Sequence, residues 1–151
     1  MNIYIASSWR NNNYKKVVHQ LRRDGHEVYD FSENGFAWEE IDEKWKDWTL
    51  YDYLKALDHQ RAIDGFQQDL EALKNADAVV LVTPCGKSAH LELGYAIGAG
   101  KLSIILLNTE PAPFNLEYRP ELMYKMADYL AIDYDELLDM LEWGGKTKLI
   151  K

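Results

Sequence analysis

The chain has 151 residues, of which 47% are hydrophobic and 13% aromatic, so its composition is that of one globular domain and not of a disordered segment. Its 17 basic and 25 acidic residues give a net charge of −8, which disfavours nucleic acid polymers and anionic membranes as partners. The single cysteine, Cys85, excludes an internal disulfide. With no signal sequence and no apolar run long enough to span a membrane, we expect a cytoplasmic protein.

The first 31 residues have the pattern of a β-α-β unit. The apolar run 3–6 predicts a strand, and polar residues that favour turns follow it. Apolar residues then recur at helical spacing from Tyr14 to Leu21. Gly25 follows at the position where a residue with a left-handed backbone conformation commonly ends a helix. Residues 28–31 predict a second strand, which a right-handed crossover makes parallel to the first.

A long connection separates this unit from the centre of the chain. Residues 32–48 are irregular and rich in tryptophan, and we expect them to form a lid or an interface. Residues 49–75 are good helix formers and predict one long or broken helix, with Gly65 as its weak point. The uninterrupted apolar run 78–82 predicts a central strand covered on both faces.

The second half of the chain continues the alternation of strands and helices. A loop at 84–87 leads into a helix that extends to about residue 100, with Ser88 as its N-cap. The other predicted elements are a strand at 103–107, a short helix at 120–126, a strand at 129–132, a helix at 135–141 and a flexible tail at 144–151. The sequence therefore predicts a doubly wound α/β fold of the flavodoxin or Rossmann type: one domain, residues 1–151, with five parallel strands in the order 2-1-3-4-5.

In such a sheet, ligands bind beyond the carboxyl ends of the strands, where the strand order reverses. That place lies between the loop after the first strand and the loop after the third. The helix that starts in the second loop attracts anions through its free N–H groups. A polar, anionic ligand is therefore indicated. The donors in the two loops are Ser7, Ser8, Arg10, Asn11, Thr83, Gly86, Lys87 and Ser88.

Two acids are candidates for chemistry near this place. Glu92 falls one turn into the helix that begins near Ser88, where the helix dipole favours an ionised carboxylate, which is a potential nucleophile. Asp69 approaches the same place only if its helix lies over the sheet. The plain alternatives are that both acids, like Arg10, are solvated surface charges, and that Tyr4 belongs to the core.

Three other chemistries are disfavoured by spacing. Residues 86–88, Gly-Lys-Ser, match the last three residues of the phosphate-binding P-loop motif. Leu81, however, stands where that motif requires glycine. A phosphatase-like loop around Cys85 would place arginine at the position of Leu91. The four histidines do not have the spacing of zinc ligands.

Taken together, several segments resemble the nucleoside 2-deoxyribosyltransferase family, which includes related deoxynucleoside-monophosphate N-glycosidases. The resemblance covers residues 2–107 and is most specific at 91–96. It rests on Ile3-Tyr4 with Trp9 five residues beyond the tyrosine, on the run 69–73 leading into 76–80, and on Leu91-Glu92-Leu93-Gly94-Tyr95-Ala96 before Gly100-Lys101.

The resemblance implies an enzyme that cleaves the N-glycosidic bond of 2-deoxynucleosides and transfers the sugar to another base. It assigns Glu92 as the nucleophile, Tyr4 as the group that holds the glutamate and the sugar, and Asp69 as a substrate contact. It implies a nucleoside or nucleotide and a free base as partners, no metal or organic cofactor, and a homo-oligomer whose subunits complete one another's sites. The substrate-binding candidates are Ser7, Ser8, Trp9, Arg10, Gly86 and Ser88.

Two alternatives remain open at this point. Arg10 and the pair Lys87-Ser88 favour a pocket that accepts a 5′-phosphate, as in the hydrolytic nucleotide N-glycosidases, in which water accepts the sugar. A module that binds or senses nucleotides without turnover keeps the same fold and the same polar loops.

Overall fold

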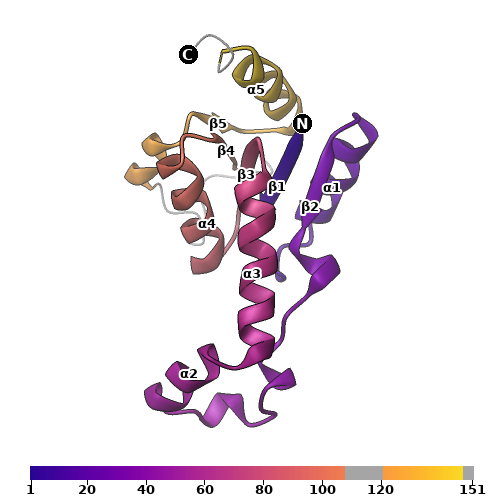
Figure 1. Cartoon of the computed structure of the whole chain (residues 1–151). Coiled ribbons are helices and arrows are strands. Elements are labelled where there is room, and N and C mark those ends of the chain that lie inside the picture. Colours follow the sequence, from indigo (N-terminus) through magenta and orange to yellow (C-terminus); the bar gives the residue numbers. More distant parts are fainter. Residues whose placement is uncertain (108–120, 148–151) are drawn as a thin grey trace.

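The computed structural model describes residues 1–107 and 121–147, which form one α/β domain around a five-stranded sheet (Figure 1). All neighbouring strands are parallel, and their order is β2-β1-β3-β4-β5, which confirms the predicted fold. The central strands β3 and β4 are buried along their whole length, as apolar runs covered on both faces should be. The strands are β1 (Asn2–Ala6), β2 (Glu27–Asp30), β3 (Ala78–Val82), β4 (Leu102–Leu106) and β5 (Tyr129–Ala131).

Helices cover both faces of the sheet. Alternate residues of β1 show the division: Ile3 and Ile5 face one apolar cluster with α1 and α5, while Tyr4 and Ala6 face another with α3 and α4. No helix in the described part of the chain is long and apolar enough to cross a membrane. The α-helices are α1 (Tyr14–Arg23), α2 (Leu50–Leu57), α3 (Gln60–Asn75), α4 (Lys87–Gly98) and α5 (Tyr134–Thr147).

The long predicted helix is broken, but the prediction of Gly65 as its weak point is wrong. The break falls at Asp58 and His59, between α2 and α3. His59 has an extended backbone, and its ring accepts a hydrogen bond from the Arg61 N–H, so it caps α3. Gly65 lies buried in the middle of α3.

The ends of two other helices also differ from the prediction. The N-cap of α4 is Gly86, whose extended backbone ends the preceding loop two residues before Ser88. Helix α5 continues through the first four residues of the predicted tail, because Gly144 packs closely on β4: a Cβ there would lie 2.5 Å from the Leu102 side chain. Residues 148–151 of that tail lie outside the described residues.

Smaller shifts affect the predicted strand and helix ends. Phe31 does not extend β2 but begins the 3-10 helix η1 (Phe31–Asn34). Strand β4 begins and ends one residue early, and β5 is one residue short of Ile132. The short helix is the 3-10 helix η4 (Leu122–Met126), and residue 120, where we predicted its start, lies outside the described residues.

The tryptophan-rich connection forms an arm at the end of α3 that lies away from the sheet (Figure 1). The connection contains the 3-10 helices η2 (Trp38–Glu40) and η3 (Trp45–Asp47), and α2 follows it in the same arm. The ring of Trp38 meets those of Phe36, Trp48 and Tyr53 edge to face, with centroids 4.7–6.0 Å apart. The arm thus has a small aromatic cluster of its own. Its role as a lid or an interface stays a prediction.

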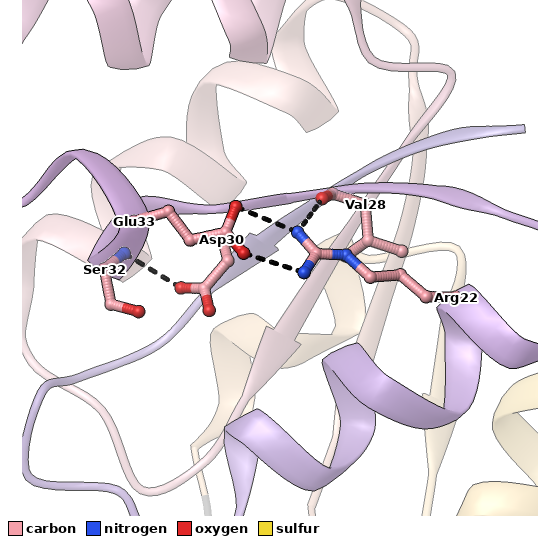
Figure 2. Close-up of polar contacts among 5 residues, drawn as sticks. All are labelled: Arg22, Val28, Asp30, Ser32 and Glu33. Carbon is pink, nitrogen blue, oxygen red and sulfur yellow. Dashed lines mark hydrogen bonds and ion pairs between the residues drawn. The ribbon is translucent and has the colours of Figure 1, made fainter.

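The turn after β2 is anchored by charge (Figure 2). Arg22 of α1 donates to both carboxylate oxygens of Glu33, at 2.7 and 3.0 Å, and to the carbonyl of Val28 at 2.8 Å. The Asp30 side chain accepts from the Ser32 N–H at 2.8 Å and so caps η1. These bonds fix the direction in which the chain leaves the sheet.

Candidate active site

A pocket of about 270 Å³ lies at the carboxyl ends of β1 and β3, where the strand order reverses. This is the place that the sequence predicts for a ligand. We call it the loop pocket. It is lined by Ser7, Ser8, Trp9, Phe31, Asn34, Phe36, Gly65, Asp69, Gly86, Lys87, Ser88, Ala89 and Glu92.

Side chains from the loop after β1 tie it to the loop after β3. Ser7 Oγ donates to the carbonyl of Val82 at 2.8 Å. The buried Asn11 amide donates to the carbonyls of Val82 and Pro84, at 3.3 and 3.2 Å, and accepts from the Asn13 N–H. Because both loops line the pocket, these bonds hold two of its walls at a fixed separation.

One end of the loop pocket is polar. Its lining residues are Gly86, Lys87 and Ser88 at the N-terminus of α4, and Ser7 and Ser8 in the loop after β1. The first N–H groups of the 12-residue helix lack partners within the helix, so this end attracts a negatively charged group.

His90 braces this polar end from behind. Its Nδ1 lies 2.7 Å from the carbonyl of Gly86, and because a carbonyl only accepts, Nδ1 must carry the proton. The other ring nitrogen, Nε2, lies 2.9 Å from the hydroxyl of Tyr124, within hydrogen-bond distance. The turn before α4 is therefore held by two successive hydrogen bonds.

The other end of the pocket is aromatic. Trp9 and Phe31 meet edge to face with centroids 5.3 Å apart, and Phe36 completes the wall. The Arg61 guanidinium lies over the Phe36 ring at 5.2 Å and donates to the carbonyl of Gly35 at 2.9 Å, which holds that ring in place. Such a wall suits a flat ring system, because aromatic rings stack on one another.

Two half-buried carboxyl groups, Asp69 and Glu92, line the same pocket. The pKa of Glu92 is raised to about 7. Burial is the largest cause, the Tyr4 hydroxyl opposes the shift, and the negative charge of nearby Asp69 adds to it. Burial also raises the pKa of Asp69, which is opposed by the Tyr29 hydroxyl that donates to Asp69 Oδ1 at 2.7 Å. Both acids thus hold a proton more tightly than an exposed carboxyl would.

Tyr4 lies beneath these acids on the central strand β1. Its ring stacks on that of Tyr29, with centroids 5.2 Å apart. Its hydroxyl is buried and has no hydrogen-bond partner of standard geometry in the described part of the chain, yet it lies close enough to Glu92 to lower the pKa of that carboxyl. Burial and the negative charge of Glu92 raise the pKa of Tyr4, so the phenol keeps its proton.

A second pocket of about 290 Å³ opens between α3 and α4; we call it the helix groove. Asp69, Ser88 and Glu92 line both pockets, so the two carboxyl groups lie where the pockets meet. The groove is otherwise largely apolar. Its lining residues are Tyr4, Phe66, Asp69, Leu70, Leu73, Ser88, Leu91 and Glu92.

The structure brings together most of the residues that the sequence singles out. Tyr4 lines the helix groove, and Arg10 lines neither pocket: its side chain is exposed, and its N–H donates to Ser8 Oγ at 3.3 Å. Asp69 meets the condition set for it, because α3 covers the sheet. The candidates that line the loop pocket are Ser7, Ser8, Trp9, Asp69, Gly86, Ser88 and Glu92.

Sequence reasoning missed the aromatic end of the pocket, formed by Phe31 and Phe36, as well as Asn34, Gly65 and the Tyr29 hydroxyl. The cluster of aromatic residues after β2 was a signal that this segment covers a ligand, but the pattern does not say which ring does so. Within residues 1–107 and 121–147, no three His, Cys, Asp or Glu side chains gather as metal ligands.

Comparison with solved structures finds the same fold in a 2-deoxyribosyltransferase from the psychrotolerant bacterium Bacillus psychrosaccharolyticus. The match has a TM-score of 0.60 and 21% sequence identity, and it covers 89% of this chain and 88% of that one. No protein-family model matches the chain. No curated protein sequence matches it either. The chain therefore has the fold of a deoxyribosyltransferase.

Proposed function

We propose that the chain cleaves the N-glycosidic bond of 2-deoxynucleosides and transfers the deoxyribosyl group to another base through a covalent bond to Glu92. The observation that carries this proposal is the position of Glu92. It is a half-buried carboxyl with a pKa of about 7, near Asp69 and Tyr4, on the lining that the loop pocket and the helix groove share. The similarity in fold to a 2-deoxyribosyltransferase supports the same reaction class.

In the first step, an oxygen of ionised Glu92 attacks C1′ of the sugar as the bond from C1′ to the base nitrogen breaks. The electron pair of that bond leaves with the base, which takes a proton from water, while Asp69, on the lining that it shares with Glu92, contacts the substrate. The adjacent carboxylate stabilises the positive charge that develops at C1′.

In the second step, a nitrogen of another base attacks C1′ and the bond to Glu92 breaks. The proton of the incoming base passes to water, so Glu92 returns to its starting state. Splitting one displacement into two through a covalent intermediate lowers the barrier of each. Tyr4, which keeps its proton, orients the Glu92 carboxyl throughout.

The two ends of the loop pocket divide the substrate between them. The aromatic end suits the base, through stacking on Phe31, Phe36 or Trp9. The polar end then receives the 5′ side of the sugar, near Ser7, Ser8 and the N-terminus of α4.

A second candidate function is hydrolysis of a 2-deoxynucleoside 5′-monophosphate, with water in place of the accepting base. The polar end favours it, because Lys87, Ser88 and the free N–H groups of α4 lie where a 5′-phosphate would reach. The exposed Arg10, in the loop after β1, is a further candidate for that phosphate, because its guanidinium can donate two hydrogen bonds to it.

One assay separates these functions. The pure protein is incubated with a panel of 2-deoxynucleosides and their 5′-monophosphates, with and without a second free base, and the products are separated by chromatography. Base exchange supports the transferase, and release of the base without an acceptor supports the hydrolase. Binding without turnover, seen as a rise in melting temperature, would instead indicate a sensing module. Unchanged turnover by Glu92→Ala would contradict the covalent route.

We also propose that the protein is a homo-oligomer. Phe66 and Leu91 at the helix groove are 66% and 76% exposed although they lie beside the half-buried acids. A neighbouring subunit over the groove would bury these side chains and exclude water from Glu92. Light scattering should give a mass of two or more chains, and a fully active monomer would contradict the proposal.

A further inference from the structure

We propose that Gly65 is a specificity-determining residue: its missing side chain leaves the space in the loop pocket that receives the second ring of a purine base. This inference rests on the proposed function, since it takes the aromatic end of the pocket as the place of the base. It adds a base class, which the fold alone does not give.

Gly65 lies on the face of α3 that lines the loop pocket, where we propose that the base binds. Arg61, Gly65 and Asp69 follow one another at intervals of four residues, so they share one face of the helix. Gly65 and Asp69 both line the loop pocket. A Cβ at position 65 would lie 3.5 Å from Cβ and Cδ2 of Phe36. Any side chain there would therefore enter the space beside the Phe36 ring, one turn from Asp69.

The packing of the protein does not require glycine at this position. The tightest approach to an added Cβ is 3.2 Å, to Nη1 of Arg61. The bonds of this arginine to Gly35 and Glu40 are made by its other nitrogen, Nη2, so Nη1 can shift by a few tenths of an ångström. Glycine also weakens a helix interior relative to alanine.

Two other glycines show what a packing requirement looks like. At Gly35 a Cβ would come 2.6 Å from the Trp9 ring, and at Gly144 it would come 2.5 Å from Leu102. Both are backbone positions that a neighbouring side chain covers. Gly65 differs from them because its nearest neighbours, the Arg61 and Phe36 side chains, would lie no closer than 3.2 Å to an added Cβ.

The size of the base follows from the distance along α3. A base whose nitrogen is bonded to the sugar carbon at Glu92 has its first ring beside Asp69. Gly65 lies one helical turn further, about 5.4 Å along the axis. A second fused ring reaches this space and lies against Phe36, whereas a single ring leaves it empty and loses those contacts.

The test uses two alanine variants. Gly65→Ala adds a methyl group to the proposed space. Gly98→Ala is the matched control, because Gly98 is also helical, an added Cβ there meets nothing within 4 Å, and it lines neither pocket. For each protein, kcat/KM is measured with deoxyadenosine, deoxyinosine, thymidine and deoxycytidine. Calorimetry measures the binding of the same four nucleosides without relying on turnover.

The parent protein should prefer the two purine nucleosides. Gly65→Ala should lower kcat/KM and affinity for them by about 10- to 100-fold, the usual effect of one methyl group in a close-fitting pocket, and should leave the pyrimidine values unchanged. Gly98→Ala should change neither. The melting temperature of Gly65→Ala should equal or exceed that of the parent, since alanine is the better helix former.

Several results would overturn the inference. For the parent protein, these are a preference for pyrimidines or binding of none of the four nucleosides. For Gly65→Ala, they are equal losses for purines and pyrimidines, no loss at all, or unfolding, which would mean that packing needs the glycine. If purines bind selectively and Gly65→Ala removes that binding, but no nucleoside is cleaved, the proposed function fails while the role of Gly65 stands.

Discussion

The two faces of the sheet use the same strands for different purposes. On the face covered by α1 and α5, Ile3 and Ile5 of β1 pack into a cluster of apolar side chains. On the face covered by α3 and α4, Tyr4 lies between them in sequence but beneath Glu92 and Asp69. One face contributes to stability through buried apolar area, and the other holds two carboxyl groups that burial makes weaker acids. Strand alternation lets one sequence do both.

The largest expected effect comes from removing the charge of Glu92, on the face of the sheet that α3 and α4 cover. Glu92→Gln keeps the shape of the side chain but removes the nucleophile, so turnover of any substrate found in the panel should fall by about 10³-fold or more. Glu71→Gln is the matched control, since Glu71 is exposed on α3. Steady-state kinetics of both variants make the comparison. Equal activities of the two would show that Glu92 has no special role.

A smaller effect is expected from the hydroxyl of Tyr4, and the chain offers a control on the opposite face. Tyr4 and Tyr14 both have buried hydroxyls without a standard hydrogen-bond partner in the described residues. Tyr4→Phe should lower kcat by about 10- to 100-fold, because Glu92 loses its orienting group. Tyr14→Phe should leave kcat unchanged. Both variants should stay folded, since each keeps its buried ring and loses only one oxygen atom. A similar loss of kcat in both would remove the distinction between the faces.

The pH dependence of the reaction should show the pKa of Glu92. Because burial raises the pKa of Glu92 to about 7, the ionised nucleophile becomes scarce below that pH. We expect kcat/KM to fall about tenfold per pH unit below a midpoint near pH 7. An acid limb with a midpoint near 4.5, the ordinary value for glutamic acid, would mean that the reacting carboxyl is not the half-buried one.

The smallest expected effect on turnover comes from a substitution on the face of the sheet that α1 and α5 cover. Ile5→Ala removes apolar contacts from the cluster with α1 and should lower the free energy of unfolding by about 2–5 kcal/mol. The activity per folded molecule should not change, because Ile5 faces away from both pockets. Urea unfolding and assays at low temperature measure the two quantities separately. A loss of activity in the folded variant would show that the faces are coupled.

The sheet could be predicted from the sequence because its signals are local. The runs Ala78–Val82 and Leu102–Leu106 are apolar throughout, and Gly25 and Gly100 have the positive φ angles that end the helices before β2 and β4. The position of Glu92 followed from a general property of parallel sheets, whose loops meet at one edge.

The remaining features depend on tertiary structure. Which ring of the segment after β2 faces the pocket is set by the bonds of Arg22 to Glu33 and Val28, between residues whose pairing no sequence pattern specifies. The role of Gly65 depends on α3 passing beside Phe36. Arg10 was placed in the pocket on chemical grounds alone, and its exposed side chain lies outside it.

The central claim is that Glu92 becomes bonded to the sugar, and mass spectrometry of the quenched protein and of its peptides tests it most directly. The parent protein is mixed with its preferred nucleoside in the absence of an acceptor base, quenched in acid during turnover and digested. The account predicts that the chain gains the mass of one deoxyribosyl group, located on the peptide that contains Glu92, and that Glu92→Gln gains none. Turnover by the parent with no such adduct, or the same adduct in the variant, would contradict it.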